Sequence, residues 1–272
     1  MNMDGFVRFL DDCAQTNYGA ITKIQLQADL TGQSVKVLRG DPFSGFIPTN
    51  DVKVVSKILC PLERTPVVAC TGLNYKTHAR EAGLELGPFP KIFFKPADTL
   101  NGPYDDVLVR SEVQEMMDYE GEFVVVMARD AKDVPANQAL NYVLGFTIGN
   151  DVSARNFSLP DTSGKCFDGF APIGPAIITT AAIPDPQKLS FTTKVNGIVR
   201  QTTSTEDMNW TVAEIIEHLS RGTTLRQGTV IMTGTPTGIG MFIKPKGFIQ
   251  DGDFVSVELD GFGGLANKFV WQ

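Results

Sequence analysis

Histidine and cysteine are scarce in this chain of 272 residues, which contains two histidines and four cysteines. Because the cysteines lack C-x-x-C spacing, neither a zinc knuckle nor a disulfide framework is expected. The longest apolar runs, at 123–128 and 175–178, are far too short to span a bilayer. The first residues show no basic segment followed by an apolar stretch, so no signal peptide is expected. We therefore expect an intracellular protein, located in the cytoplasm, with no membrane partner.

Positive charge is also in short supply. The formal net charge is −7 and the sequence pI is about 4.9. Because phosphate binding needs a basic face and the lysines and arginines form no cluster, a nucleic-acid partner is not expected. One or two cations inside a pocket can still attract an anion despite a negative surface. Composition therefore favours small-molecule chemistry and is compatible with an anionic substrate.

Short apolar segments separated by Gly and Pro dominate the sequence from Val67 onward, and they predict a β-rich core. These segments read VVACTG, KIFFKP, GEFVVVMA, YVLGFTIGND, GPAIITT, FTTKVNG, GTVIMTG and DFVSVELDG. Earlier in the chain, shorter alternating pieces such as 6–10 and 35–38 lie between turn residues. We therefore expect a small β-rich N-terminal domain over 1–65 and a larger domain over 66–272.

Only two segments have a helical pattern, 135–142 and 211–220. In the second, apolar residues recur at helical spacing, and Thr211 is suited to be the N-cap. Since the strands do not alternate regularly with helices, a doubly wound fold and a TIM barrel are both disfavoured. The fold class that follows is mixed α/β, with β-structure dominant.

Glu120 and Glu122 form an E-x-E pair at the start of the apolar segment 123–128. Residues two apart in a strand point to the same face, so both carboxylates are expected in one site. Two buried anions this close need a cation or a proton to compensate them. Asp151 ends another apolar segment and adds a third carboxylate if the two strands are neighbours. Three carboxylates suit Mg²⁺, Mn²⁺ or Ca²⁺ better than zinc, unless E-x-E merely lines the solvent face of an edge strand.

Seven short sequence motifs occur in order between residues 72 and 240. They are GLNYKTHAREAG (72–83), FFKP (93–96), DYEGE (118–122), NDVSARN (150–156), GKCFDGFAPIGP (164–175), VNG (195–197) and TGTPTGIG (233–240). Together they resemble the fumarylacetoacetate hydrolase family over most of residues 66–270, in particular its acylpyruvate hydrolase and oxaloacetate decarboxylase branch. VLRGDPFSG (37–45) and LCPLE (59–63) also resemble the small leading domain of longer members, especially fungal ones.

The resemblance implies a β-roll fold of the fumarylacetoacetate hydrolase C-terminal type, in a homodimer. It implies Mg²⁺ or Mn²⁺ held by Glu120, Glu122 and Asp151, with Ca²⁺ as a substitute in crystals. It also implies a catalytic dyad of His78 and Glu81 on a short helix that closes over the substrate. At positions i and i+3 the two side chains share one helical face, where the carboxylate can orient the imidazole.

The resemblance further implies that Lys165 is a catalytic cation and that Arg155, Thr235 and Lys95 contact the substrate. Many relatives carry a substrate-contacting Gln where Ser158 stands in this chain. The segment between Arg155 and Lys165 is also shorter than is usual in the family. We therefore expect the substrate contact at Ser158 to be shortened or lost.

Several of these residues also have simpler interpretations. Arg155 could merely pair with Asp151, and Lys165 could be a solvated loop lysine. His218, the second histidine, is interpreted as an incidental surface residue, and Cys166 as a packing residue. TGTPTGIG lacks the Lys-Ser/Thr ending of a phosphate loop, so its glycines are expected to serve tight turns.

The predicted function is cleavage of a C–C bond in a 2-oxo acid or β-diketo acid by a divalent-metal-dependent hydrolase or decarboxylase. The substrate would chelate the metal, which acts as a Lewis acid and stabilises an enolate. In hydrolysis, His78 and Glu81 would activate water. Two alternatives stay open: a decarboxylase or isomerase of a specialised-metabolism substrate, and a non-catalytic binding protein on the same fold.

Overall fold

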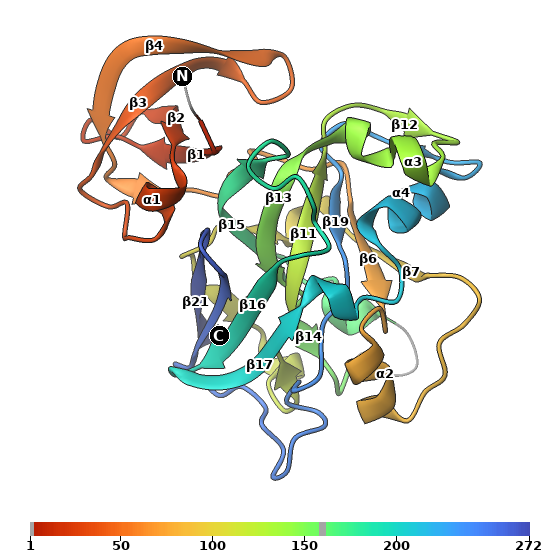
Figure 1. The fold of residues 1–272 in the computed structure, drawn as a ribbon. Helices are drawn as coiled ribbons and strands as arrows, with labels where there is room; N and C mark the ends of the chain where they lie inside the picture. Colours follow the sequence, from red (N-terminus) through yellow and green to blue (C-terminus); the bar gives the residue numbers. More distant parts are fainter. Residues whose placement is uncertain (1–2, 158–161) are drawn as a thin grey trace.

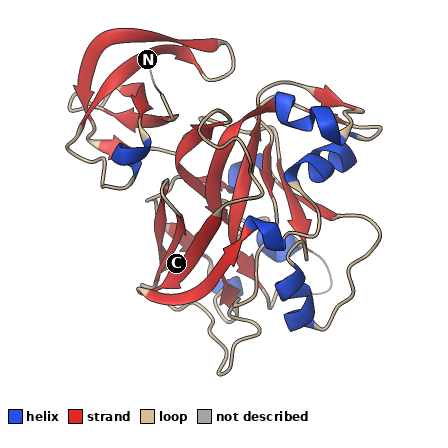
Figure 2. Ribbon diagram, viewed as in Figure 1, coloured by secondary structure: helices blue, strands red, loops and turns tan. Residues whose placement is uncertain are grey.

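The computed structural model describes residues 3–157 and 162–272. Strands make up 42% of the chain and helices 15%, which confirms the β-dominated mixed α/β class (Figure 2). The larger sheet has twelve strands, with β5 (Lys57–Ile58) beside β1 and β8 (Leu100–Asn101) beside β15. The other ten lie in the order β4 (Gly45–Val54), β3 (Ser34–Asp41), β2 (Thr16–Ile21), β1 (Gly5–Leu10), β15 (Ala171–Thr179), β13 (Val143–Asn150), β11 (Gly121–Met127), β19 (Val230–Met232), β6 (Val68–Gly72) and β7 (Lys91–Lys95).

A second sheet of five strands packs beside the first (Figure 1). Its spatial order is β17 (Ile198–Ser204), β16 (Ser190–Val195), β20 (Phe254–Leu259), β21 (Gly263–Trp271) and β9 (Val107–Val109). Two short pairs complete the β-structure: β10 (Met117–Asp118) with β14 (Ser153–Ala154), and β12 (Ala131–Lys132) with β18 (Thr224–Leu225). All eight apolar segments expected to form strands do so, and β17 and β21 are the longest of the strands that were not expected after residue 66.

The helices are short. They are α1 (Lys23–Leu26), α2 (Lys76–Ala82), α3 (Ala136–Ala139) and α4 (Val212–Ser220), with 3-10 turns η1 (Ala97–Thr99), η2 (Ser111–Val113), η3 (Leu140–Tyr142), η4 (Ser163–Lys165) and η5 (Thr205–Asp207). Both expected helical segments are confirmed. The first is α3 followed by η3, and the second is α4. Thr211 caps α4, because its hydroxyl accepts from the Glu214 N–H while the Glu214 carboxylate accepts from the Thr211 N–H.

The strand β11 is buried on both faces, which explains its unbroken apolar sequence. Phe123 and Val125 face a cluster that includes Phe191 on β16. Val124 and Val126 face the opposite way, into a second cluster with residues of β15 and β19. With both faces filled by apolar side chains, the polar residues of this strand are confined to its beginning.

The N-terminal strands β1 to β4 and α1 form a lobe at one end of the larger sheet (Figure 1). β1 pairs with β15 through Gly5 and Phe6, so the sheet runs on across the expected boundary at residue 65. Phe6 and Leu38 also share an apolar cluster with Ile177 and Val230. The division at 65 and 66 therefore stays a prediction. No helix among the described residues is long and apolar enough to cross a membrane.

Candidate active site

The three carboxylates lie together at one end of β11 and β13. Glu120 directly precedes β11, Glu122 is its second residue, and Asp151 follows β13. The two strands are antiparallel, and the Asp151 N–H donates to the Glu120 carbonyl over 2.8 Å. A carboxylate oxygen of each residue lies within 4.8 Å of the other two, and all three side chains are buried. The pairing of β11 with β13 thus supplies the proximity that the sequence expectation required.

Gly121 separates the two glutamates because no side chain fits there. A Cβ at this position would lie 2.0 Å from the Thr193 hydroxyl oxygen and 3.2 Å from Oε1 of Gln201. β11 lies between β13 and β19, so the alternative in which E-x-E lines the solvent face of an edge strand is wrong. The glutamates stand at the start of a strand that lies between two others in the sheet.

Two buried lysines, Lys95 and Lys165, donate hydrogen bonds to the carboxylates. The Lys165 ammonium group donates to Asp151 at 2.6 Å, to the Ser153 hydroxyl at 2.7 Å and to Glu120 at 3.0 Å. Lys95 is fully buried, and its ammonium group donates to the other Asp151 oxygen at 2.6 Å. The interpretation of Lys165 as a solvated loop lysine is wrong, because the side chain is buried. All three N–H bonds of Lys165 are used by these partners.

Arg155 is the third cation of the site. Its Nε donates to Asp118 over 2.9 Å, and its Nη2 donates to Glu120. The simpler interpretation, in which Arg155 pairs with Asp151, is therefore wrong. Five guanidinium N–H bonds are available and these contacts use two, so Arg155 retains donors for another anion.

The pKa values of the two glutamates are shifted in opposite directions. Burial alone would raise the pKa of Glu120, but Lys165 and Arg155 outweigh burial and lower this pKa to about 2. Burial raises the pKa of Glu122 well above its usual range, and the charges of Asp151 and Glu120 raise it further. Glu120 is thus held as a carboxylate, whereas Glu122 is driven to bind a proton.

Glu122 is the carboxylate of the site that lacks a positively charged partner among the described residues. Among the described residues its side chain accepts one hydrogen bond, from the Gly234 N–H at 2.6 Å, and forms no ion pair. A divalent cation in reach of Glu120, Glu122 and Asp151 would supply the missing positive charge in place of a proton. Carboxylate oxygens are donors that Mg²⁺, Mn²⁺ and Ca²⁺ prefer, so the donor set fits a hard divalent cation.

The segment 233–240 holds the acidic residues of the site through its main chain. Three of its glycine N–H groups each donate to a different carboxylate. The pairs are Gly234 with Glu122 at 2.6 Å, Gly238 with Glu81 at 3.0 Å and Gly240 with Asp118 at 2.7 Å. Gly234 and Gly238 have φ angles of +99° and +103°, which disfavour other residues. The glycines thus serve turns, as expected, and also bind carboxylates.

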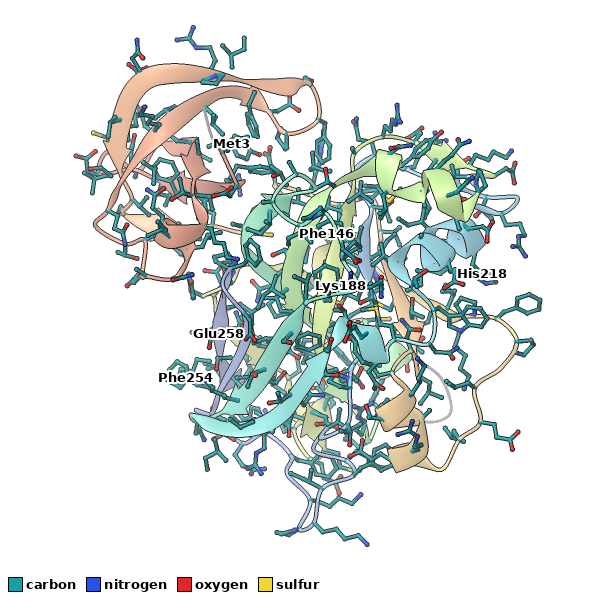
Figure 3. The ribbon with its side chains drawn as sticks, in the orientation of Figure 1. Met3, Phe146, Lys188, His218, Phe254 and Glu258 are labelled. Atoms are coloured by element: carbon teal, nitrogen blue, oxygen red, sulfur yellow. The ribbon has the colours of Figure 1, made fainter. Side chains whose placement is uncertain are left out.

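His78 and Glu81 form the pair that their spacing predicts. Both lie on α2, with 3.0 Å between the His78 Nδ1 and the Glu81 Oε2. The other Glu81 oxygen accepts from the Gly238 N–H, so the carboxylate is fixed from two sides. Among the described residues, the His78 Nε2 makes no hydrogen bond, and the charge of His78 acts on Glu120 and lowers its pKa. The second histidine, His218, lies on α4 and stacks on the Phe89 ring at 5.8 Å between centroids (Figure 3).

The helix α2 is fastened to the segment that follows β17. Asp207 accepts from the Thr77 N–H at 3.0 Å and from the Thr77 hydroxyl at 2.6 Å. The Asn74 side chain donates to the carbonyls of Trp210 and Thr233 and accepts from the Trp210 N–H. These contacts set the position of the dyad relative to the carboxylates.

Two further residues, Thr235 and Ser158, were expected to contact the substrate. The Thr235 hydroxyl donates to the Gly121 carbonyl at 3.0 Å and accepts from the Gln201 side chain at 2.8 Å. Ser158 lies outside the described residues. Cys166 lies next to Lys165, and its sulfur is 3.5 Å from the Thr162 carbonyl oxygen.

Sequence reasoning missed two residues that organise this site. Asp118 stands in the DYEGE motif and accepts from Arg155, from Gly240 and from the Met241 N–H, so its position in the motif was an available signal. Gln201 on β17 accepts from the Gly121 N–H at 3.0 Å and is buried. Nothing in the local sequence around Gln201 marks it, because the contact depends on how β17 packs against β11.

Known proteins resemble this chain in sequence and in fold. An oxaloacetate tautomerase from Bos taurus, named FAHD2A and mitochondrial, is 39% identical over 217 residues, covering 78% of this chain and 69% of that protein. The solved structure of a 2-hydroxyhepta-2,4-diene-1,7-dioate isomerase from Mycobacterium marinum has a TM-score of 0.83 and 32% identity, covering 100% and 99% of the two chains. A 5-carboxymethyl-2-hydroxymuconate delta-isomerase from Mycobacterium smegmatis has a TM-score of 0.84 and 32% identity, covering 98% and 100%.

The family comparison covers the region that contains every residue of the site. The fumarylacetoacetate (FAA) hydrolase C-terminal family matches residues 67–270. Its start lies close to the expected boundary at residue 65, and the N-terminal lobe lies outside it. On the strength of this match and of these relatives, the chain belongs to the fumarylacetoacetate hydrolase family of enzymes.

Proposed function

We propose that the protein is a divalent-cation-dependent enzyme that interconverts the keto and enol forms of a 2-oxo dicarboxylic acid such as oxaloacetate. The observation that carries the proposal is the arrangement of His78. Its Nδ1 lies 3.0 Å from the Glu81 carboxylate, and among the described residues its Nε2 makes no hydrogen bond. The charge of His78 also contributes to the low pKa of Glu120. A proton carrier beside a chelating site is what keto–enol exchange requires. The bovine relative named oxaloacetate tautomerase and the two isomerases support this choice.

We propose Mg²⁺ or Mn²⁺ as the cation, with Glu120, Glu122 and Asp151 as the residues that hold it. When bound there, the cation would supply Lewis-acid chemistry, drawing electron density from the carbonyl oxygen of a 2-oxo acid. Lys95, which is fully buried, would orient Asp151 for this task rather than contact the substrate as expected from the sequence.

The proton step is assigned to His78. In the keto-to-enol direction, Nε2 accepts a proton from the carbon next to the carbonyl, while the carbonyl oxygen takes a proton from water and the imidazolium then releases its proton to water. The reverse direction returns the proton to carbon. Glu81 keeps the imidazole in one orientation and stabilises the imidazolium that forms, because its carboxylate faces Nδ1. Gly238 fixes Glu81 in turn.

The cations of the site have separate tasks in this proposal. Lys165 contributes its positive charge to the developing enolate, since its N–H bonds already donate to Asp151, Glu120 and Ser153. Arg155 has donors to spare and would bind the carboxylate next to the 2-oxo group. Thr235 would position Gly121 between the two glutamates through its 3.0 Å contact.

Cleavage of a C–C bond is the second candidate function. Hydrolysis of a β-diketo acid and decarboxylation of oxaloacetate also generate an enolate at the 2-oxo group, so the same residues would serve them. In hydrolysis, His78 would instead remove a proton from water. A non-catalytic binding protein is a weaker candidate, because relatives of this chain are named as enzymes.

The test is turnover of oxaloacetate by chelator-treated protein with and without added Mg²⁺ or Mn²⁺. Loss of the enol absorbance without pyruvate formation is expected, and it should depend on the added metal. Pyruvate release would assign decarboxylation instead, and conversion of acetylpyruvate to pyruvate and acetate would assign hydrolysis.

A Glu122→Gln variant supplies the matched control, because it retains the volume of the side chain and removes one charged ligand. Metal-restored activity in the wild type together with none in this variant would support the proposal. Binding of Mn²⁺ by the wild type with no turnover of either acid would contradict it and favour the binding protein.

A further inference from the structure

The lysine and arginine side chains around the three carboxylates already donate hydrogen bonds to them. Lys95 and Lys165 are buried and donate to Asp151, and Arg155 donates to Glu120. A 2-oxo dicarboxylic acid brings two carboxylates, and Arg155 has donors for the one beside the 2-oxo group. A further cation would help to hold the far carboxylate, because an anion that is taken out of water without a partner is strongly unfavourable.

Arg200 lies at an irregularity in the pairing of β17 with β16. Thr193 of β16 pairs with Gln201, and the next residue, Lys194, pairs with Val199, so Arg200 is the extra residue of a β-bulge. A bulge turns a side chain away from the direction that regular alternation would give it, and bulges are common beside active sites. Gln201, the next residue, donates to Thr235 of the site. The bulge therefore lies against the active-site segment.

The contacts of Arg200 place it beside the segment that fixes the dyad. A Cβ at Gly238 would lie 2.0 Å from the Arg200 carbonyl oxygen, so the 233–240 segment packs directly on its main chain. The Gly238 carbonyl accepts from the Tyr119 hydroxyl at 2.8 Å. Burial raises the pKa of Tyr119, and the positive charge of Arg200 opposes this effect.

Arg200 is partly exposed, but one of its N–H donors is buried without an acceptor among the described residues. Its Nε is buried and makes no hydrogen bond, and among the described residues its guanidinium forms no ion pair. A buried N–H without an acceptor is costly, roughly 1–3 kcal/mol, and is rare in native proteins. An arginine fork matches a carboxylate with two parallel hydrogen bonds, so a ligand carboxylate would satisfy this donor.

We propose that Arg200 binds the second carboxylate of the substrate and thereby selects dicarboxylic over monocarboxylic 2-oxo acids. The inference rests on the proposed function for the choice of a 2-oxo acid. It adds a specificity residue on β17, next to Gln201, which already contacts Gly121 and Thr235.

The experiment compares two ligands that differ at one end only. Oxaloacetate carries a carboxylate where 2-oxobutyrate carries a methyl group, and the Kd of each is measured by calorimetry in the presence of Mn²⁺. The wild type should bind oxaloacetate more tightly. In Arg200→Gln, this preference should fall by about 10- to 100-fold, as expected for the loss of a charge-assisted hydrogen bond. Arg200→Lys, which keeps the charge, should retain part of it.

Arg8→Gln is the matched control, since Arg8 is also a partly buried arginine on a strand but lies in the N-terminal lobe. It should leave the preference unchanged. An Arg200→Gln protein that keeps its thermal unfolding temperature and the full preference would overturn the inference, as would a wild type without any preference. If the wild type prefers oxaloacetate yet never turns it over, the proposed function fails while the role of Arg200 stands.

Discussion

Glu122 carries the strongest electrostatic constraint of any single residue in the site. Its buried carboxylate has a raised pKa, so in the metal-free protein the folded state binds a proton that the unfolded chain has released. Between the ordinary carboxyl range and the raised pKa, the free energy of unfolding must therefore fall as the pH rises. A bound cation would oppose this loss because it stabilises the carboxylate.

For Glu122→Gln, we expect the metal-free protein to lose this pH dependence and to be more stable than the wild type near neutral pH by roughly 1–3 kcal/mol. The reason is that glutamine needs no proton or cation to be buried. Thermal unfolding of chelator-treated protein across the pH range measures the effect. Glu258→Gln, on the exposed surface of β20, is the control. An unchanged slope in Glu122→Gln would show that this carboxyl does not titrate as its burial implies.

His78 is the residue whose loss should affect chemistry and little else. His78→Gln is expected to lower kcat by about 10²- to 10⁴-fold, the usual contribution of a general acid–base group. Mn²⁺ affinity should stay within a few-fold, because His78 is not among the three carboxylates. Steady-state kinetics and metal titration measure the two effects, with His218→Gln as the histidine control. Full turnover in His78→Gln would remove the dyad from the mechanism.

At the scale of elements, the short helix α2 depends on its neighbours for its position. Seven residues are too few for a helix to be stable alone in water. The contacts of Thr77 with Asp207 and of Asn74 with Trp210 therefore decide where the dyad lies. The sequence expectation of a helix that closes over the substrate stays a prediction.

Asp207→Ala should lower kcat by about 10- to 100-fold with little change in Mn²⁺ affinity, because a displaced α2 misplaces His78 by a fraction of a helical turn. Hydrogen exchange over residues 76–82 should rise in parallel. Glu206→Ala is the control, since Glu206 lies on the same 3-10 turn and is exposed. If both variants behave alike, the Asp207 contact does not position the dyad.

The 233–240 segment depends on glycine at the scale of a loop. Gly238→Ala combines a φ of +103° with a clash against the Arg200 carbonyl, so we expect a loss of roughly 2–5 kcal/mol. Gly197→Ala also has a positive φ but meets no atom within 4 Å, and it should cost roughly 1 kcal/mol. Denaturant unfolding compares the two variants. Equal losses would mean that the close packing on β17 is unimportant.

At the scale of the whole molecule, the N-terminal lobe and the larger unit share one sheet. β1 pairs with β15, and Phe6 packs in the same cluster as Ile177. We therefore expect a single cooperative unfolding transition in calorimetry, since neither part can lose its structure without exposing apolar surface of the other. Two separate transitions would instead favour independent domains divided near residue 65. Dimerisation and a cytoplasmic location stay predictions from the sequence.

The sequence by itself determined the chemical composition of the site and the local structure around it. Apolar periodicity gave the strands, Thr211 with Glu214 gave a capped helix, and the i, i+3 spacing placed His78 next to Glu81. These features depend on residues within a few positions of each other, so local physical rules are sufficient to predict them.

Only the tertiary structure decided which charges meet. Arg155 pairs with Asp118 and Glu120 and leaves Asp151 to the lysines, and no cationic side chain in the described part of the chain pairs with Glu122. Gln201 comes to the site through the packing of β17. Contacts of this kind join residues far apart in the chain, and their energies depend on burial and on the sum of neighbouring charges. Neither quantity can be obtained from local spacing, because the folded chain sets both.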